Sequence, residues 1–347
     1  MRKVNYKFSS ASVDILFDAS FGHLSKLVDQ KNAVIITDEN IFSLHRKKFK
    51  NWNVITLKPG EEFKIQLTAD AIIEQLIEFR ADRSTTLIGV GGGVVTDLTG
   101  YVASIYMRGI SFAFVPTSLL AMVDASIGGK NGVDVGAFKN LVGTIRQPLF
   151  LLYDYSFLKT LPEIEWSNGF AEIIKQACIF DKELFELLKS SDLNKMKKNA
   201  KLLSSVIEKN VDLKSTVVKK DEFEKGDRKL LNFGHTLGHA LETQYELTHG
   251  QAVALGMVFA SWLSERLSGL KNSLELIEVL TKYKLPTLAS FDAERVFNVL
   301  SMDKKRVSSK MNFILLKKYG KGMVHAISLD QLKKHVVGYA KLNKTGK

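Results

Sequence analysis

The chain has 347 residues, of which 45% are hydrophobic and 25% charged, a composition typical of a folded globular protein and not of a disordered one. Its length suggests two domains. The sequence contains no run of about 18 apolar residues, so no membrane span is predicted. The formal net charge is +12, but the 39 lysines and 10 arginines are dispersed and no nucleic-acid-binding motif accompanies them. We therefore expect a lysine-rich solvated surface, with neither a nucleic acid nor a membrane as partner.

The cellular compartment is indicated by the first residues and by the cysteine content. The opening MRKVNYKFSSASVD lacks the apolar core of a secretory signal. Cys178 is the one cysteine, which excludes an internal disulfide and is typical of a reducing environment. We expect a cytoplasmic protein in which Cys178 fills space in the core.

The first half of the chain alternates strand and helix patterns. Residues 3–18 predict a β ribbon at the start, and residues 67–79 have apolar side chains at helical spacing. The predicted strands are residues 33–37, 53–57, 85–90, 112–115 and 150–153. Strands that alternate with helices predict a Rossmann-like, mainly parallel sheet.

After about residue 160 most apolar residues recur at a period near 3.6. The predicted helices are residues 163–180, 181–190, 201–223 and 251–269, and the late strands are residues 311–318 and 323–328. The fold class is thus α/β, with a nucleotide-binding-like domain over residues 1–160 and a mostly helical domain over residues 161–347.

A glycine-rich turn follows the predicted strand at residues 85–90 and reads GGGVVTDLTG. Glycines between a strand and a helix present backbone N–H groups to phosphate. The dinucleotide fingerprint is incomplete, because Gly89 and Gly91 are followed by Val94 at the third glycine position. The turn indicates a nucleotide or phosphate site, and a plain tight turn is the alternative. Asp97 could accept a bond from a ribose hydroxyl or favour the helix N-terminus.

A second glycine-rich segment, residues 122–140, carries Lys130 and Lys139. Glycines beside a lysine allow an anion to approach closely, and the lysine supplies a point charge. A mobile surface loop is the alternative.

Three of the seven histidines lie in NFGHTLGHALETQYELTHG, residues 232–250. His235 and His239 are four residues apart, so helical spacing places both on one face and favours them as a pair of zinc ligands. His249 could supply a third ligand. Glu172 is a plausible carboxylate ligand, since it lies in a largely apolar helix where an unpaired charge would be costly.

Taken together, the motifs resemble those of the 3-dehydroquinate synthase family from about residue 33 to about residue 320. The motifs that carry the resemblance are GGGVVTDLTGYVASIYMRG, VPTSLLAMVDASIGGKNGVD, KNLVG, GFAEIIK, LLNFGHTLGHALE, HGQAVALGM and MDKK.

The resemblance implies a lyase of the shikimate pathway that uses NAD+ and one divalent metal ion, Zn²⁺ or Co²⁺. Its reaction converts 3-deoxy-D-arabino-heptulosonate 7-phosphate to 3-dehydroquinate and phosphate. The steps are transient oxidation, phosphate elimination, re-reduction, ring opening and aldol closure. A homodimer is also implied.

By motif, the implied metal ligands are Glu172, His235 and His249. The resemblance therefore implies that His239 contacts the substrate and is not a metal ligand. The implied substrate contacts, mostly cationic or amide groups, are Arg108, Asp124, Lys130, Asn140, Lys175, Lys214, Arg228, Asn232, His239, and Lys304 or Lys305. The implied NAD contacts are Asp38, Glu61, Glu62, Lys64, Gly93, Val94, Asp97, Thr117, Ser118, Lys130, Lys139, Phe157, Leu158, Lys159 and Thr160.

The chain departs from the usual family pattern at Thr96, Ser118, Asn131 and Phe138, which leaves the geometry of the nucleotide loops open. The alternatives are another sugar-phosphate cyclase, of the 2-deoxy-scyllo-inosose or valiolone type, and a metal-dependent polyol dehydrogenase of the same superfamily.

Overall fold

The computed structural model describes residues 1–136, 138–302 and 310–345, and it divides the chain into two compact units. Unit 1 comprises Met1–Glu165 and Ile207–Phe223, and unit 2 comprises Trp166–Val206 and Glu224–Lys347. Among the described residues, no helix is long and apolar enough to cross a membrane.

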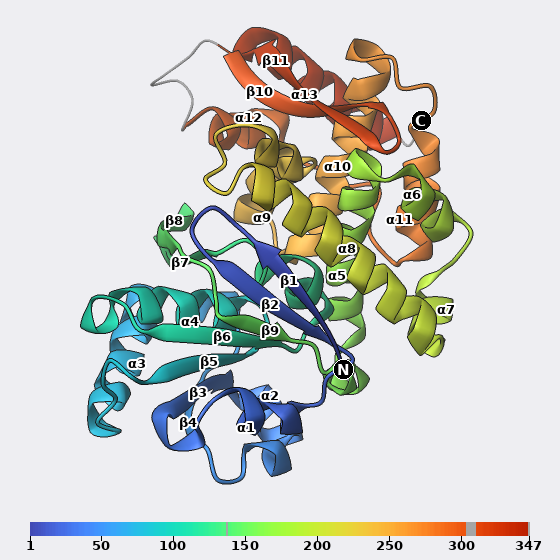
Figure 1. The fold of residues 1–347 in the computed structure, drawn as a ribbon. Helices are drawn as coiled ribbons and strands as arrows, with labels where there is room; N and C mark the ends of the chain where they lie inside the picture. Colours follow the sequence, from blue (N-terminus) through green and yellow to red (C-terminus); the bar gives the residue numbers. More distant parts are fainter. Residues whose placement is uncertain (137, 303–309, 346–347) are drawn as a thin grey trace. The chain divides into compact units, whose positions relative to one another are not determined.

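Unit 1 is built on a seven-stranded sheet with the order β1-β2-β9-β6-β5-β3-β4 (Figure 1). All pairings are parallel except that of β1 with β2. The strands are β1 (Arg2–Lys7), β2 (Ser12–Phe17), β3 (Ala33–Asp38), β4 (Asn53–Leu57), β5 (Thr86–Gly91), β6 (Ser111–Pro116) and β9 (Phe150–Leu152). The helices are α1 (Leu24–Leu27), α2 (Glu39–Leu44), α3 (Gln66–Glu78) and α4 (Gly93–Ile105). The predicted strands, the opening ribbon and the parallel sheet are confirmed.

The order of the strands locates the place where this sheet can bind a ligand. The chain leaves β3 for its neighbour β4 and then returns across β3 to β5, so the direction of winding reverses between β3 and β5. Ligands of open parallel sheets bind beyond the carboxyl ends of the strands at such a reversal. Asp38 ends β3 and the glycine turn ends β5, so both lie at this point.

Most described residues of the second glycine-rich segment form regular structure, which contradicts the alternative of a mobile surface loop. A π-helical turn, Ala121–Ala125, is followed by a hairpin of β7 (Lys130–Val135) and β8 (Phe138–Ile145). Gly132 pairs with Gly143, and a Cβ atom on either glycine would overlap the opposite backbone. The glycines therefore serve the close approach of two strands, and they hide the alternation that normally predicts a hairpin.

Unit 2 is mostly helical, as predicted. Its helices include α5 (Glu163–Phe180), α6 (Lys182–Lys189), α7 (Leu193–Lys198), α9 (His235–Gln244), α10 (His249–Leu267), α11 (Leu274–Lys282), α12 (Ala293–Met302) and α13 (Leu329–Thr345). One antiparallel hairpin, β10 (Lys310–Lys318) and β11 (Lys321–Ser328), accompanies them.

The division of the chain differs from the expected boundary between residues 160 and 161. The long helix α8 (Ala200–Lys220) passes from unit 2 into unit 1, where the segment Ile207–Phe223 belongs. The Tyr6 hydroxyl donates to Asp212 at 3.1 Å, and Arg2 forms an ion pair with Glu208. Because helical periodicity does not show which core a helix joins, this return could not be read from the sequence.

Glu222, two residues after the end of α8, holds the turn of the opening ribbon. The backbone N–H and hydroxyl of Ser10 donate to its carboxylate at 3.0 and 2.5 Å, the Ser9 hydroxyl donates as well, and Gln147 donates at 2.8 Å. Burial raises the pKa of Glu222, but these hydrogen bonds outweigh it and lower the pKa from 4.5 to about 2.

A Glu222→Gln substitution should therefore lower stability by about 1–2 kcal/mol near neutral pH. Since the folded-state pKa is depressed, the stabilising effect is present above the unfolded pKa and is lost as pH falls toward the folded value. The gap between the urea-unfolding midpoints of wild type and variant should narrow between about pH 7 and about pH 3.5. Glu74→Gln, an exposed change on α3, is the control and should leave the midpoint unchanged at each pH. A gap that is constant with pH would contradict the assignment.

Candidate functional site

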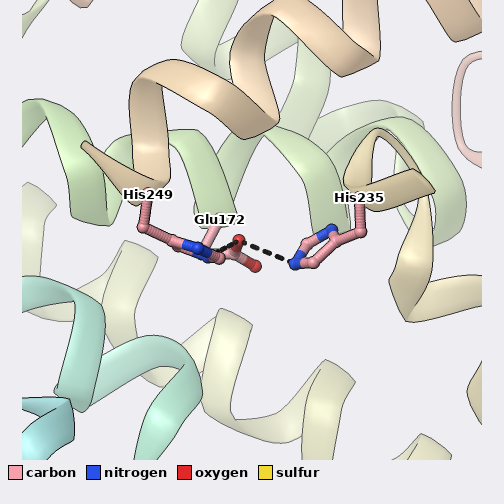
Figure 2. Close-up of side chains that lie close together, drawn as sticks. All are labelled: Glu172, His235 and His249. Carbon is pink, nitrogen blue, oxygen red and sulfur yellow. Dashed lines mark hydrogen bonds and ion pairs between the residues drawn. The ribbon is translucent and has the colours of Figure 1, made fainter. Parts of the chain in front are cut away.

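Three side chains of unit 2 converge on a common point. Glu172 comes from α5, His235 begins α9 and His249 begins α10, and Figure 2 shows Glu172 between the two imidazoles. Glu172 Oε1 lies 3.3 Å from His249 Nε2 and 3.6 Å from His235 Nε2. The three ligand atoms all lie within 4.8 Å of one another. Two imidazole nitrogens and one carboxylate oxygen are the donor set of a catalytic zinc site, so these residues fit a divalent metal ion.

The convergence depends on the close approach of α9 and α10. Gly234 has φ of +81° and caps α9 in the left-handed region. A Cβ atom on Gly256 would overlap the carbonyl oxygen of Gly234, and one on Gly238 would lie 2.9 Å from the carbonyl oxygen of Ala252. Three glycines thus remove the side chains that would keep the two histidine-bearing helices apart.

Glu172 is fully buried, and its charge is matched inside the protein. Lys175, one helical turn further along α5, forms an ion pair with Glu172 Oε2 and is itself buried. Burial raises the pKa of Glu172, but Lys175, His235 and His249 together hold it well below its usual range. The carboxylate is therefore ionised, as a metal ligand must be.

The two histidines are held differently. Burial, together with the charge of Lys175, lowers the pKa of His235 well below its usual range, so its imidazole is neutral. Burial also lowers the pKa of His249, but the nearby carboxylates of Glu172 and Glu242 outweigh it and raise the pKa to about 9.

His239 lies outside the group of Glu172, His235 and His249. It is exposed, and its ring centroid lies 5.1 Å from that of His235 and 6.3 Å from that of His249. Helical spacing correctly predicted that His235 and His239 are neighbours, but it is the Glu172 carboxylate that faces His235.

In unit 1, the carboxyl ends of three adjacent strands carry predicted nucleotide residues. Asp38, at the end of β3, accepts a 2.9 Å bond from Ile41 N–H and caps α2, and burial raises its pKa. Gly93 and Val94 form the first turn of α4 after β5, where the backbone N–H groups have no intrahelical partner. Thr117 and Ser118 follow β6, and Thr117 N–H donates to Gly91 O at 2.9 Å.

A buried lysine organises the neighbouring carboxylates. Lys64 Nζ lies 2.7 Å from Glu61, 3.5 Å from Asp97 and 3.7 Å from Asp134, and it donates to Asn140 Oδ1 at 2.9 Å. Burial lowers the pKa of Lys64, but the carboxylates outweigh it and raise the pKa above its usual range. Burial raises the pKa of Asp97 to about 7, with Glu61 adding to the rise and Lys64 opposing it.

Two departures from the family pattern are explained by packing. Asn131 is buried and donates to Gly129 O at 2.7 Å and to Arg146 O at 3.0 Å, so it closes the base of the β7–β8 hairpin. Thr96 is buried, and its hydroxyl donates to Gly93 O at 2.9 Å. Phe138 is exposed.

The remaining predicted residues are placed as follows. Lys214 is buried and donates to the carboxylate and the carbonyl of Asp124, both at 2.7 Å, because the π-helical turn directs both oxygens to it. Arg228 is buried, and Asn232 donates to Glu224 at 2.9 Å. Phe157 and Leu158 are buried. The predicted residues with exposed side chains are Glu61, Glu62, Arg108, Lys130, Lys139, Asn140, Lys159 and Thr160. Lys304 and Lys305 lie outside the described residues.

Two carboxylates at these sites were not among the predicted residues. Glu242 lies beside His249, and its spacing of three from His239 and seven from His235 places it on the same face of α9, so helical periodicity could have found it. Asp134 accepts a 2.6 Å bond from Asn140 N–H, which no sequence signal indicates, since the hairpin was not predicted.

Comparison with known proteins gives matches along most of the chain. Residues 54–168 match the family model of the 3-dehydroquinate synthase N-terminal part, and residues 169–306 match that of the C-terminal part. The 3-dehydroquinate synthase of Campylobacter concisus is 41% identical over 333 residues, 92% of this chain and 94% of the relative. That of Sulfurimonas denitrificans is 41% identical over 315 residues, 87% and 89% of the two chains.

Solved structures with a similar fold include two sugar-phosphate cyclases. A 2-deoxy-scyllo-inosose synthase in complex with carbaglucose-6-phosphate, NAD+ and Co²⁺ has a TM-score of 0.84 at 25% identity, over 96% of this chain and 99% of that one. A 2-epi-5-epi-valiolone synthase from Streptomyces hygroscopicus with NAD+ and Zn²⁺ has a TM-score of 0.86 at 24% identity, over 96% and 98%. At this lower identity, the valiolone synthase structure supports the fold alone.

The packing of α9 on α10 can be tested at Gly256. Gly256→Ala should lower stability by roughly 1–3 kcal/mol, because the new methyl group overlaps the Gly234 carbonyl and the helices must separate. Gly338→Ala, in α13, is the matched control, since its Cβ atom meets no atom within 4 Å and alanine favours a helix. Thermal unfolding should show a lower midpoint for the first variant and an equal or higher one for the second. Equal midpoints for Gly256→Ala and wild type would refute the close-packing argument.

Proposed function

This chain belongs to the 3-dehydroquinate synthase family, so its reaction is the formation of 3-dehydroquinate, and we propose that it uses NAD+ and one divalent metal ion. The observation that carries the proposal is the convergence of Glu172, His235 and His249 on one point of unit 2. The substrate is 3-deoxy-D-arabino-heptulosonate 7-phosphate, and the products are 3-dehydroquinate and phosphate.

We infer that Glu172, His235 and His249 hold the ion. When bound, the ion supplies Lewis-acid chemistry that makes the substrate hydroxyl more acidic before oxidation. The donor set suits Zn²⁺ or Co²⁺, and the similar 2-deoxy-scyllo-inosose synthase structure holds Co²⁺. Lys175 would keep Glu172 ionised and so ready to bind a cation.

NAD+ would bind in unit 1, where it supplies a reversible hydride acceptor. The first turn of α4 offers backbone N–H groups to the pyrophosphate at Gly93 and Val94. The carboxylates around Lys64 accept hydrogen bonds and so suit ribose hydroxyls better than a bare phosphate. The buried Asn131 and Thr96 support these loops from within, so the two departures fit NAD+ binding.

The anionic groups of the substrate need fixed cations. Lys214 would supply one, held in place by Asp124, and Arg228 would supply a second with the planar geometry that suits a carboxylate. His239, exposed beside the metal ligands, would contact substrate rather than metal. Arg108, Lys130, Asn140 and Asn232 stay predictions of the same resemblance, as do a homodimer and a cytoplasmic location.

A substrate panel tests the proposed reaction. With the heptulosonate phosphate, NAD+ and Zn²⁺ or Co²⁺, the protein should release inorganic phosphate without net NADH, because the hydride returns to the intermediate within one turnover. Phosphate and absorbance assays run together measure both. Stoichiometric NADH would instead indicate a polyol dehydrogenase. Turnover of glucose 6-phosphate or sedoheptulose 7-phosphate, with none of the heptulosonate, would indicate a different cyclase.

Metal analysis of single variants tests the assignment of the histidines. His235→Ala and His249→Ala should each lose bound metal, because each removes one of three protein ligands. His239→Ala should retain metal and lose turnover. Zinc content by elemental analysis, with phosphate release measured on the same samples, distinguishes the roles. A His239→Ala protein devoid of zinc would overturn the assignment.

A further inference from the structure

Each of the three metal ligands has a partner on the side that faces away from the common point. Glu172 Oε2 pairs with Lys175, and His235 Nδ1 lies 3.3 Å from the carbonyl oxygen of Phe233. His249 Nδ1 lies 3.8 Å from Glu242 Oε2, on the opposite side of the ring from Glu172. Lys175 and Phe233 each lie within three residues of the ligand that they contact. Glu242, in contrast, is a carboxylate of α9 that faces a ligand of α10.

We propose that Glu242 is a positioning residue for the metal centre. It holds the His249 ring with its proton on Nδ1 and its Nε2 lone pair directed to the point shared with Glu172 and His235. The inference rests on the metal site of the proposed function and adds to it a residue that the ligand set does not include.

The position of His249 shows why its ring needs such a partner. Its backbone is fixed, because it is the first residue of α10 and Thr248 caps the helix through a reciprocal pair of bonds with Gln251. The ring can still rotate about its side-chain bonds, and His249 is more accessible than the other two ligands, with 32% of its side chain exposed. Packing alone therefore restrains this ring least, and the partner at Nδ1 is the remaining restraint.

Glu242 is placed to provide this restraint. It lies two turns along α9 from His235, and only 7% of its side chain is exposed. A carboxylate so far removed from water is costly unless a donor faces it, and the Nδ1–H of His249 is such a donor. The close approach of α9 and α10 at Gly238 brings the two side chains together.

The tautomer gives this contact its chemical effect. A neutral imidazole has one N–H and one lone pair, so a proton on Nδ1 leaves Nε2 free to bind a cation. A carboxylate at Nδ1–H stabilises that tautomer and makes Nε2 a stronger donor, an effect of outer-shell partners on metal-bound histidines that typically changes metal affinity about 10–100-fold. For His235 the Phe233 carbonyl has the same role without a charge.

A second metal ion is the competing interpretation of this cluster. One ligand atom each from His239, Glu242 and His249 also lie within 4.8 Å of one another. Because Nε2 of His249 faces Glu172, a second ion would have to bind Nδ1 of the same ring. The imidazole would then bridge two cations and lose its last proton. We favour the orienting role because, with a cation at Nε2, it leaves the ring neutral rather than anionic.

The experiment measures Co²⁺ binding to the full-length protein by competition with a chelator, together with the visible spectrum of bound Co²⁺. Glu242→Leu should weaken binding about 10–100-fold and alter the spectrum, because the ring loses its restraint. Glu242→Gln, which keeps an acceptor and loses the charge, should bind with intermediate affinity. Glu246→Gln, a loss of charge at an exposed site on the same segment, is the control and should match wild type. Thermal midpoints of the metal-free proteins identify any variant that fails to fold.

His235→Ala separates the failure of this inference from the failure of the metal site itself. If His235→Ala binds Co²⁺ as tightly as wild type, the proposed metal site is wrong. If His235→Ala loses Co²⁺ but folded Glu242→Leu keeps wild-type affinity and spectrum, only the role of Glu242 is wrong. Wild-type affinity of Glu242→Gln beside a weakened Glu242→Leu would show that an uncharged acceptor suffices, which overturns the role assigned to the carboxylate. Two ions per wild-type chain, with one lost in Glu242→Leu, would favour the second metal site.

Discussion

The buried carboxylate of Glu172 is the constraint on which the arrangement of unit 2 depends. Removing an ionised carboxylate from water costs several kcal/mol unless cations and hydrogen-bond donors surround it. Lys175 supplies the nearest cation from the same helix, and the imidazoles of His235 and His249 face the other carboxylate oxygen from α9 and α10. The three helices are therefore held together by a charge that hydrophobic packing alone would not tolerate. A metal ion at this point would supply part of the positive charge that offsets the buried carboxylate. The same carboxylate therefore explains both why the three helices come together and why a cation can bind between them.

The arrangement of helices and strands also depends on glycines, because they let backbone elements approach where side chains would prevent it. In unit 2 they bring α9 against α10. In unit 1 a Cβ atom on Gly100 of α4 would overlap the buried amide of Asn131 in β7, so the helix and the hairpin can meet only at a glycine. Both glycine-rich stretches of the sequence thus have structural reasons that do not require a ligand. Their sites arise because close approach of backbone also exposes N–H groups and aligns side chains.

Periodicity was sufficient to predict the parallel sheet, the helical second half and most strands, because these elements bury regular apolar faces. It failed for the β7–β8 hairpin, in which Gly132 and Gly143 replace the alternating side chains, and for the allocation of Ile207–Phe223, which depends on long-range pairs such as Tyr6 with Asp212. At the site, spacing along α9 predicted that His235 and His239 are neighbours. It could not pair His235 with Glu172, because that contact joins helices far apart in the sequence. The apolar surroundings of Glu172 in the sequence made it a candidate ligand, and the family motifs grouped it with His235 and His249.

Burial, and not composition, sets four of the predicted site cations apart from the surface charge. The chain has 49 lysines and arginines, and their excess suggested only a solvated surface. Among the described residues, the buried ones are Lys64, Lys175, Lys214 and Arg228, and all four had been selected by motif. Each of the three lysines is held by a carboxylate, Glu61, Glu172 and Asp124 respectively. A lysine buried without such a partner would lose its proton, whereas a paired one keeps its charge in a place from which water is largely excluded. There a fixed positive charge attracts a phosphate or carboxylate far more strongly than a lysine on the surface does. The net charge of +12 is therefore no guide to a substrate site, whereas the buried, paired lysines lie where an anion would be held most strongly.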